Sequence, residues 1–172
     1  PLFLISYACS DSFDNNFYNN HGSVGLINIP TARFFDEEVH GITVYDGTPD
    51  QKITLTSNPY DWFEASFFYT NIQGKPYPGF EYQDYKDKGF NIKARLKQEG
   101  QLPAIAIGLN DFAGTGFYSS EYIVTSYGIK NIDFHFGVGW GQLSGDDSIK
   151  NPLGYISDRF KTRPIDYTGM GG

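Results

Sequence analysis

The sequence predicts an all-β chain, an antiparallel meander of about eight strands that forms part of an outer-membrane β-barrel. In residues 90–97 and 132–141, apolar and polar side chains alternate without a break, so each segment has one apolar and one polar face. Aromatic residues make up 17% of the 172 residues, yet the mean hydropathy is −0.40, which fits apolar residues spread singly along strands. Several such segments of about 9–11 residues are typical of outer-membrane barrels. A soluble β-sandwich has the same alternation and stays an alternative.

The chain begins with a segment that differs from the rest. Residues 1–8 read as the remnant of a secretory signal peptide, with Ser6 and Ala8 as the small residues before a cleavage point. Cys9 follows Ala8 directly, so a lipoprotein cleavage site is an alternative, although Ser6 stands where a large aliphatic residue is usual. An ordinary structural role for this segment is the third possibility. Cys9 is the single cysteine, so no internal disulfide can form.

Two further regions follow the signal-peptide remnant. Residues 9–21 form a polar, low-complexity stretch that we expect to be a flexible tether. Residues 22–172 are the barrel portion, a fragment that we expect to continue beyond residue 172 in the intact protein. Within it, Gly, Pro, Asn and Asp clusters separate the expected strands. These strands lie at residues 25–29, 39–45, 52–56, 61–72, 90–98, 103–111, 119–129 and 132–143.

Turns and loops complete the predicted meander. Residues 57–60 read as a tight hairpin turn. Residues 73–88 contain two Gly, two Pro and six charged residues, and predict a long polar loop. The residues after 143 are expected to be mostly loop. No segment makes a convincing helix, because the best candidate, 31–38, lacks an apolar stripe.

The apolar positions of the strands define a predicted lipid-facing surface. It comprises Ile42, Val44, Ile53, Leu55, Phe63, Phe67, Phe90, Ile92, Leu96, Ile105, Ile107, Leu109, Ile132, Phe134, Phe136 and Val138.

The opposite, polar face supplies the candidate lumen-lining residues. They are Glu64, Lys93, Arg95, Lys97, Asp133 and His135. Lys93, Arg95 and Lys97 recur on one face of a single strand, where they could guide an anionic polysaccharide. Alternatively, they form a cross-strand ladder with Glu64, Asp111 and Asp133, in which opposite charges stabilise by roughly 0.2–1 kcal/mol per pair. The two interpretations are compatible.

Several function classes find no support in the sequence. The net charge of −7 argues against nucleic acid as a partner. The three histidines, His21, His40 and His135, fall on separate elements, so no metal site is predicted. No Gly-x-Ser-x-Gly motif is present, and no pair of carboxylates is placed to converge as glycosidase chemistry requires. We therefore expect no catalytic residues, no cofactor and no enzymatic activity. An enzyme on a β scaffold, such as a polysaccharide lyase or hydrolase, stays a third possibility for which the sequence nominates no carboxylate.

One motif connects the chain with a known family. The stretch 22–33 reads Gly-Ser-Val-Gly-Leu-Ile-Asn-Ile-Pro-Thr-Ala-Arg and resembles the start of the YjbH-type exopolysaccharide biosynthesis proteins. Residues 63–69, 102–111, 114–122, 137–141 and 151–154 look like later pieces of the same family in the same order. The resemblance implies an outer-membrane β-barrel of a Gram-negative bacterium, encoded with exopolysaccharide or capsule secretion genes, in a protein much longer than 172 residues. No catalytic residues are carried over.

The signature Pro30, Thr31, Ala32 and Arg33 also has a structural interpretation, in which Pro30 ends a strand, Thr31 starts a turn and Arg33 pairs with Asp36 or Glu37. The expected function is non-enzymatic participation in the export or surface assembly of exopolysaccharide. Its expected partners are outer-membrane lipid, an anionic polysaccharide and other secretion proteins. A secreted carbohydrate-binding β-sandwich is the alternative.

Overall fold

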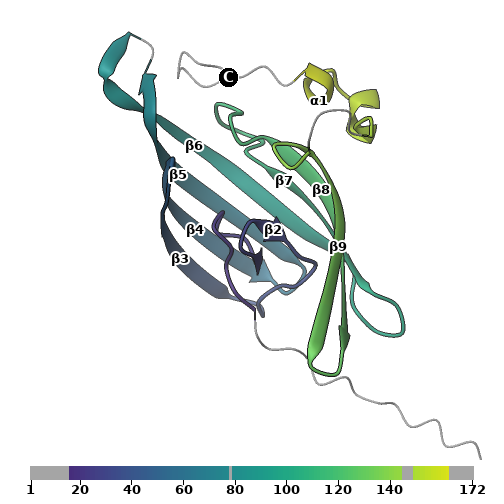
Figure 1. The fold of residues 1–172 in the computed structure, drawn as a ribbon. Coiled ribbons are helices and arrows are strands. Elements are labelled where there is room, and N and C mark those ends of the chain that lie inside the picture. Colours follow the sequence, from purple (N-terminus) through teal and green to yellow (C-terminus); the bar gives the residue numbers. More distant parts are fainter. Residues whose placement is uncertain (1–15, 78, 145–148, 163–172) are drawn as a thin grey trace, which may run out of the picture.

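A computed structural model describes residues 16–77, 79–144 and 149–162 of the chain (Figure 1). The expected signal-peptide remnant, residues 1–8, and Cys9 lie outside the described residues.

The described chain is dominated by one antiparallel sheet of seven strands, arranged in the order of the sequence. The predicted all-β antiparallel meander is therefore confirmed. The strands are β3 (Val39–Asp46), β4 (Asp50–Tyr60), β5 (Phe63–Tyr77), β6 (Phe80–Lys97), β7 (Ala104–Asn110), β8 (Ser120–Ile129) and β9 (Ile132–Gly141). A second, two-stranded sheet is formed by β1 (Gly25–Leu26) and β2 (Ile29–Pro30). The expected single strand at 25–29 is thus a small hairpin that turns at Ile27 and Asn28.

The β5–β6 hairpin is much longer than predicted. Residues 73–88 are not a loop, because β5 extends to Tyr77 and β6 begins at Phe80. Two glycines with positive φ, Gly74 and Gly79, occur in this extension at positions that favour glycine. Alternation continues beyond them: Tyr85 and Asp87 are buried, whereas Lys86 and Lys88 are exposed. The Tyr77 and Tyr85 rings stack at a centroid distance of 5.5 Å and stabilise the extension.

The predicted turn at residues 57–60 is also displaced. Strand β4 continues through Tyr60, with a register irregularity between Ser57 and Tyr60, and the chain turns at Asp61 and Trp62. Asn58 is fully buried in the sheet. A register irregularity lets the strand accept Pro59, which cannot donate a ladder hydrogen bond.

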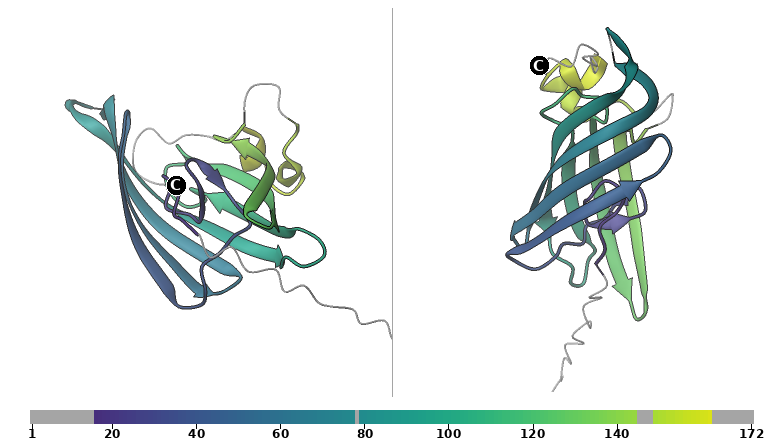
Figure 2. Two further views of the ribbon diagram at one scale, coloured as in Figure 1. Left: turned by 60° about the horizontal axis from the view of Figure 1, so that its bottom comes forward. Right: turned by 90° about the vertical axis from the view of Figure 1, so that its left-hand side faces the viewer.

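The sheet is strongly curved (Figure 2). Its two faces differ in composition. The convex face is apolar and exposed: Ile42, Val44 and Phe136 retain 72%, 75% and 73% of their accessible surface. Fifteen of the sixteen residues of the predicted lipid-facing surface occupy convex-face positions of their strands. The exception is Leu96, which is exposed but lies unpaired at the register irregularity between Arg95 and Lys97. The concave face is polar and mostly buried, as in β4, where Lys52, Thr54 and Thr56 alternate with exposed neighbours.

The concave face is buried because residues 16–38, here called the N-terminal segment, lie inside the curve of the sheet (Figure 2). Its apolar contribution is small: Ala32 and Phe34 pack in one cluster with Ala104, Ala106, Tyr122 and Val124 of β7 and β8. The remaining contacts are largely polar. Residues 16–21 of the expected tether belong to this folded segment, and Asn19 among them is buried.

After β9 the chain forms two short helices, η1 (Pro152–Tyr155) and α1 (Arg159–Thr162), near one end of the sheet (Figure 1). The expectation of no helix is wrong to that small extent. Trp140 Nε1 donates to the Ile149 carbonyl at 2.8 Å, and Asn151 Nδ2 donates to Glu121 Oε2 at 2.8 Å, so this region is tied to β8 and β9. Among the described residues, no helix has the length and apolar character needed to cross a membrane.

Candidate functional site

The N-terminal segment owes its local shape to short-range polar contacts. Asn19 Oδ1 accepts hydrogen bonds from the amides of His21 (2.9 Å) and Ser23 (3.1 Å), which is the turn-forming behaviour typical of asparagine. Gly22 adopts a positive φ of 77° in this turn, and Thr56 Oγ1 of β4 donates to its carbonyl at 2.5 Å. The turn is therefore fixed to the sheet as well as to itself.

A buried ion pair anchors the segment to β5 and β6. Glu64 and Lys93 are directly opposite residues on these strands, and Lys93 Nζ lies 3.4 Å from Glu64 Oε2. Lys93 Nζ also donates to the carbonyls of Val24 and Arg33, each at 2.9 Å, while Glu64 accepts from Ser23 Oγ and the Val24 amide. Only 1% of Lys93 and 2% of Glu64 is exposed. Both charges thus reach the hydrogen-bond partners that buried ions require.

The signature residue Arg33 joins the segment to the opposite side of the sheet. Its Nε and Nη2 atoms donate to the two carboxylate oxygens of Asp133 on β9, at 2.8 and 2.6 Å, and Nη1 lies 2.5 Å from Glu99 Oε2. The hydrogen bonds to Asp133, followed by the contact with Glu99, raise the pKa of Arg33. The expected ion pair of Arg33 with Asp36 or Glu37 is therefore wrong: a planar guanidinium binds these two distant carboxylates instead.

The other signature residues support the same crossing. Strand β2 ends at Pro30, as expected. Thr31 Oγ1 accepts from the Arg33 amide at 3.3 Å, which forms the expected turn, and the Ala32 amide donates to Ser126 Oγ of β8 at 2.9 Å. The Pro30–Arg33 stretch is thus the part of the N-terminal segment that reaches β8 and β9.

The remaining candidate lumen residues divide into two groups. Arg95 lies on the concave face, 3.5 Å from Asp61 and over the Phe34 ring, and His135 is also there, 2.8 Å from Ser126 Oγ. Lys97, in contrast, is exposed beyond a register irregularity that separates it from Arg95. The structure therefore brings Glu64, Lys93, Arg95, Asp133 and His135 to the concave side and leaves Lys97 outside this group.

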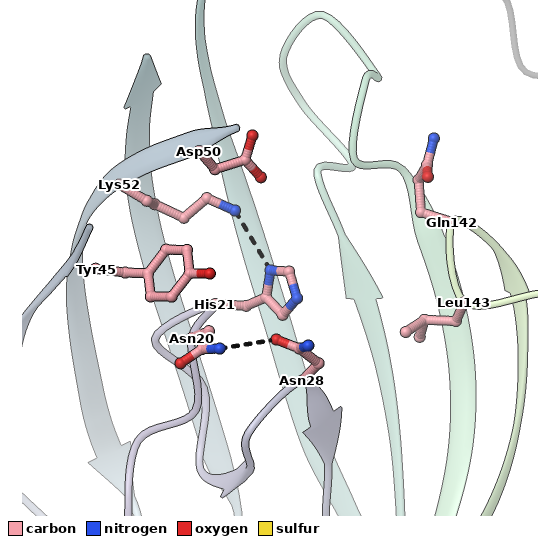
Figure 3. Close-up of a pocket in the computed structure, with 8 residues that line it drawn as sticks. All are labelled: Asn20, His21, Asn28, Tyr45, Asp50, Lys52, Gln142 and Leu143. Atoms are coloured by element: carbon pink, nitrogen blue, oxygen red, sulfur yellow. Dashed lines mark hydrogen bonds between the residues drawn. The ribbon is translucent and has the colours of Figure 1, made fainter. Parts of the chain in front are cut away.

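A polar pocket lies beside the N-terminal segment, between its first turn and the end of β9 (Figure 3). Its volume is about 310 Å³. The segment, the ends of β3 and β4, and the residues after β9 supply its lining: Asn20, His21, Asn28, Tyr45, Asp50, Lys52, Gln142 and Leu143.

Lys52 is the most unusual member of this lining. It is 4% exposed, and its Nζ lies 3.3 Å from His21 Nδ1 (Figure 3) and 4.1 Å from the centre of the Tyr118 ring. Burial, followed by the nearby Lys52 charge, lowers the pKa of His21 to about 4. His21 is therefore neutral near pH 7, and its Nδ1 can accept a hydrogen bond from the Lys52 ammonium.

The sequence reasoning missed Lys52 and His21. Lys52 occupies a polar position in the alternating stretch 51–56, which signals the concave face but not a pocket. His21 belongs to a stretch without periodicity. The one sequence signal for this region is the adjoining signature motif. Within the described parts of the chain, no group of three His, Cys, Asp or Glu residues is arranged to hold a metal ion.

Comparison with known proteins identifies relatives of this sequence. Residues 17–172 match the family YjbH, described as exopolysaccharide biosynthesis protein YbjH. A protein of Escherichia coli (strain K12) named "Uncharacterized lipoprotein YjbH" is 34% identical over 158 residues, which cover 89% of this chain. The chain spans 23% of the length of that relative. No solved structure matches significantly. The chain therefore belongs to the YjbH exopolysaccharide biosynthesis family.

Proposed function

We propose that this chain is part of an outer-membrane β-barrel protein that takes part in the export or surface assembly of exopolysaccharide or capsule. Its role is non-enzymatic: a polar interior conducts or holds the polymer, and the size and charge of that interior determine selectivity. Family membership supports the connection with exopolysaccharide. The location and the mechanism are parts of the proposal.

One observation carries the membrane assignment. The sheet buries its polar face and exposes its apolar face, which is the reverse of the arrangement in a water-soluble domain. Exposed apolar side chains are distributed along all seven strands of the sheet, with Ile42 on β3, Ile53 on β4, Phe90 on β6, Ile107 on β7 and Phe136 on β9 among them. An apolar surface of this extent is stable in contact with lipid and prone to aggregation in water.

The β-sandwich alternative fits these observations less well. A sandwich packs the apolar face of one sheet on the apolar face of another. In the described chain, the second sheet is the small β1–β2 hairpin, and it belongs to the segment on the polar, concave side. Strands β3 and β9 are the edges of the seven-stranded sheet, where further strands of the longer protein could pair.

A cell-envelope location agrees with the name of the relative, which is called a lipoprotein. That name favours the lipoprotein alternative for Cys9, in which the processed chain begins at a lipidated cysteine. A lipid at this position would add an anchor to the N-terminal segment that occupies the concave face.

An anionic polysaccharide and other secretion proteins remain proposed partners. The cations that we expected to guide the polymer have internal partners: Lys93 binds Glu64 and two carbonyls, and Arg95 lies near Asp61. This arrangement favours the cross-strand ladder for Lys93. Charge selection of an anionic polymer would therefore depend on parts of the interior other than this strand.

The test uses the full-length protein, refolded from denaturant into detergent micelles and then analysed by gel electrophoresis with and without boiling. A closed barrel would migrate faster before boiling than after, and would give a β-type circular dichroism spectrum. Folding as a soluble monomer without detergent would overturn the barrel proposal and make the carbohydrate-binding sandwich the leading account.

A further inference from the structure

The pocket beside the N-terminal segment continues into a second, smaller one. The second pocket has a volume of about 170 Å³ and shares His21, Lys52, Gln142 and Leu143 with the first. The first, at about 310 Å³, is at the lower end of the roughly 300–1,000 Å³ range of small-molecule sites. Because they share these four residues, we treat them as one groove on the concave side of the sheet, polar in its first part and mixed in its second, with room for a small unit of a longer chain.

The lining of the first pocket suits a ligand that donates and accepts hydrogen bonds at the same time. Asn20 Nδ2 donates to Asn28 Oδ1 at 3.0 Å (Figure 3), which leaves the second N–H of Asn20 and the Nδ2 of Asn28 as donors and the Asn20 Oδ1 as an acceptor. The Gln142 amide offers both kinds of group, and Asp50 and Lys52 add one acceptor group and one donor group. Tyr45 lies on the same side as Lys52 (Figure 3). Sugar hydroxyls have this dual character, whereas a lipid tail or another apolar ligand would leave these groups unpaired.

Aromatic rings extend the lining in the second pocket. Phe68 and Tyr118 both belong to it, together with Asn91, Asn110 and Ser120. Their rings are approached by Lys52 Nζ at 5.2 Å and 4.1 Å, respectively. Phe68 is 2% exposed and Tyr118 is partly exposed, so Tyr118 is the ring that a ligand can reach. A pyranose presents C–H groups on its ring faces and hydroxyls around its edge, so one accessible aromatic ring among small polar side chains matches its surface.

The charges of the groove do not favour an anion. Among the described residues, Lys52 has no carboxylate within 4.0 Å of its Nζ, yet Asp50, Asp87 and Asp111 all interact with it electrostatically over longer distances. Asp50 itself lines the first pocket. The single lysine is therefore balanced by carboxylates, and a carboxylated sugar would meet no excess of positive charge.

We propose that this groove binds a neutral hexopyranose unit of a polysaccharide, with ring hydroxyls on Asn20, Asn28, Lys52 and Gln142. The inference rests on the proposed function for the carbohydrate nature of the ligand, and adds the chemical class of the unit that is recognised. It leaves charged units elsewhere in the same polymer free of contact with the groove.

The test is calorimetric titration of the full-length protein in lipid nanodiscs with two oligosaccharides of equal length, maltohexaose as the neutral probe and hexagalacturonate as the anionic one. Gln142→Ala removes an exposed side chain of the groove, and the loss of one or two uncharged hydrogen bonds should weaken maltohexaose binding about two- to tenfold. Gln98→Ala is the matched control, because Gln98 is exposed and lines neither pocket. Asn28→Trp, at another exposed position of the lining, should block the groove and abolish binding.

Maltohexaose binding that is weakened by Gln142→Ala and abolished by Asn28→Trp, with Gln98→Ala unchanged, would support the inference. Stronger binding of hexagalacturonate at the same site would overturn the choice of a neutral unit. No binding of either probe, or binding that both groove variants leave unchanged, would overturn the site. Insertion into nanodiscs is measured separately from sugar binding. Insertion without sugar binding would contradict the proposed sugar site but not the barrel. Sugar binding by a protein that does not insert would contradict the barrel proposal but not the sugar site.

Discussion

The two faces of the seven-stranded sheet satisfy their side chains in opposite ways. On the concave face, charged and hydroxyl side chains such as Lys93, Glu64 and Thr56 are buried, and the N-terminal segment of the same chain provides their hydrogen-bond partners. On the convex face, apolar side chains such as Val44 and Phe136 stay exposed. The concave face is thus completed by the protein itself, whereas the convex face depends on its surroundings. Stability should therefore respond differently to changes on the two faces.

The largest effect is expected for the buried ion pair of the concave face. Glu64→Leu leaves Lys93 without its carboxylate while both remain covered by the N-terminal segment. Removing one partner of a buried pair costs about 3–5 kcal/mol, because the other charge stays in a poorly polar environment. Denaturant unfolding of the full-length protein in detergent should show this loss of unfolding free energy.

The double variant Glu64→Leu, Lys93→Met is the control for that prediction. Because it removes both charges, it should recover most of the stability lost in the single variant. The single variant Lys93→Met completes the comparison. If the double variant loses as much unfolding free energy as Glu64→Leu and Lys93→Met lose in sum, Glu64 and Lys93 are not energetically coupled and do not act as a joint anchor.

The next effect tests the convex face. Phe134→Lys places a charge among exposed apolar side chains of β9. If the position lies near mid-membrane, folding into lipid should become less favourable by about 2–4 kcal/mol. Folding into phospholipid vesicles, followed by tryptophan fluorescence in urea, measures it. Asn131→Lys, in the adjacent β8–β9 turn, is the matched control and should have little effect. An unaffected Phe134→Lys would mean that the convex face does not contact lipid.

A smaller effect is expected where the N-terminal segment reaches β9. Arg33→Lys keeps the charge but loses the planar fork that binds Asp133 and Glu99, so the free energy of unfolding should fall by about 1–2 kcal/mol. Amide hydrogen exchange of the N-terminal segment should accelerate more than that of the central strands. Arg159→Lys, at an exposed position of α1, is the control. Equal exchange in both variants would show that Arg33 does not hold the segment.

Period-two alternation was sufficient to predict the two faces of the sheet. In β9, and in β6 as far as Arg95, the predicted apolar sets lie together on the convex face. The register irregularity between Arg95 and Lys97 ends this agreement in β6. Alternation failed at residues 73–88, because glycines, prolines and charges there resemble a loop although the chain is paired as far as Tyr77 and Phe80. Local turn signals do not reveal that a long hairpin can continue through them.

The N-terminal segment was not predictable from local pattern at all. Its contacts join residues far apart in sequence, with a separation of 69 for Lys93 and Val24 and of 100 for Arg33 and Asp133. Periodicity describes a single element and contains no information on such pairs. The signature at Pro30–Arg33 pointed to this region of the chain. In the structure, however, Arg33 binds Glu99 and Asp133, which are far from it in sequence.

Some buried polar atoms of the described residues have no hydrogen-bond partner, among them atoms of Asn58, Asp87 and Asp111. Asp111 gives the smallest and most specific effect. Asp111, 3% exposed, accepts from the Tyr118 amide at 3.0 Å through Oδ2, whereas no described donor reaches its Oδ1. Burial, followed by the charge of Asp87, raises the pKa of Asp111 to about 7. The folded state then binds a proton that the unfolded state has released, so this group makes stability fall as pH rises from about 4 through 7.

His21 acts in the opposite direction over the same range. Its pKa is lowered to about 4, so the unfolded state binds the additional proton and stability falls as pH decreases from about 6.5 towards 4. The two slopes partly cancel in the native chain, and each must be measured as a difference between variants. Between pH 6 and 7, Asp111→Asn should gain about 1 kcal/mol relative to the native chain, and His21→Gln should lose a somewhat smaller amount. Parallel stability profiles for Asp111→Asn and the native chain would mean that Asp111 is ionised and satisfied in the folded protein. In that case burial of Asp111 would not penalise its charged form, and the assigned cause of its raised pKa would be wrong.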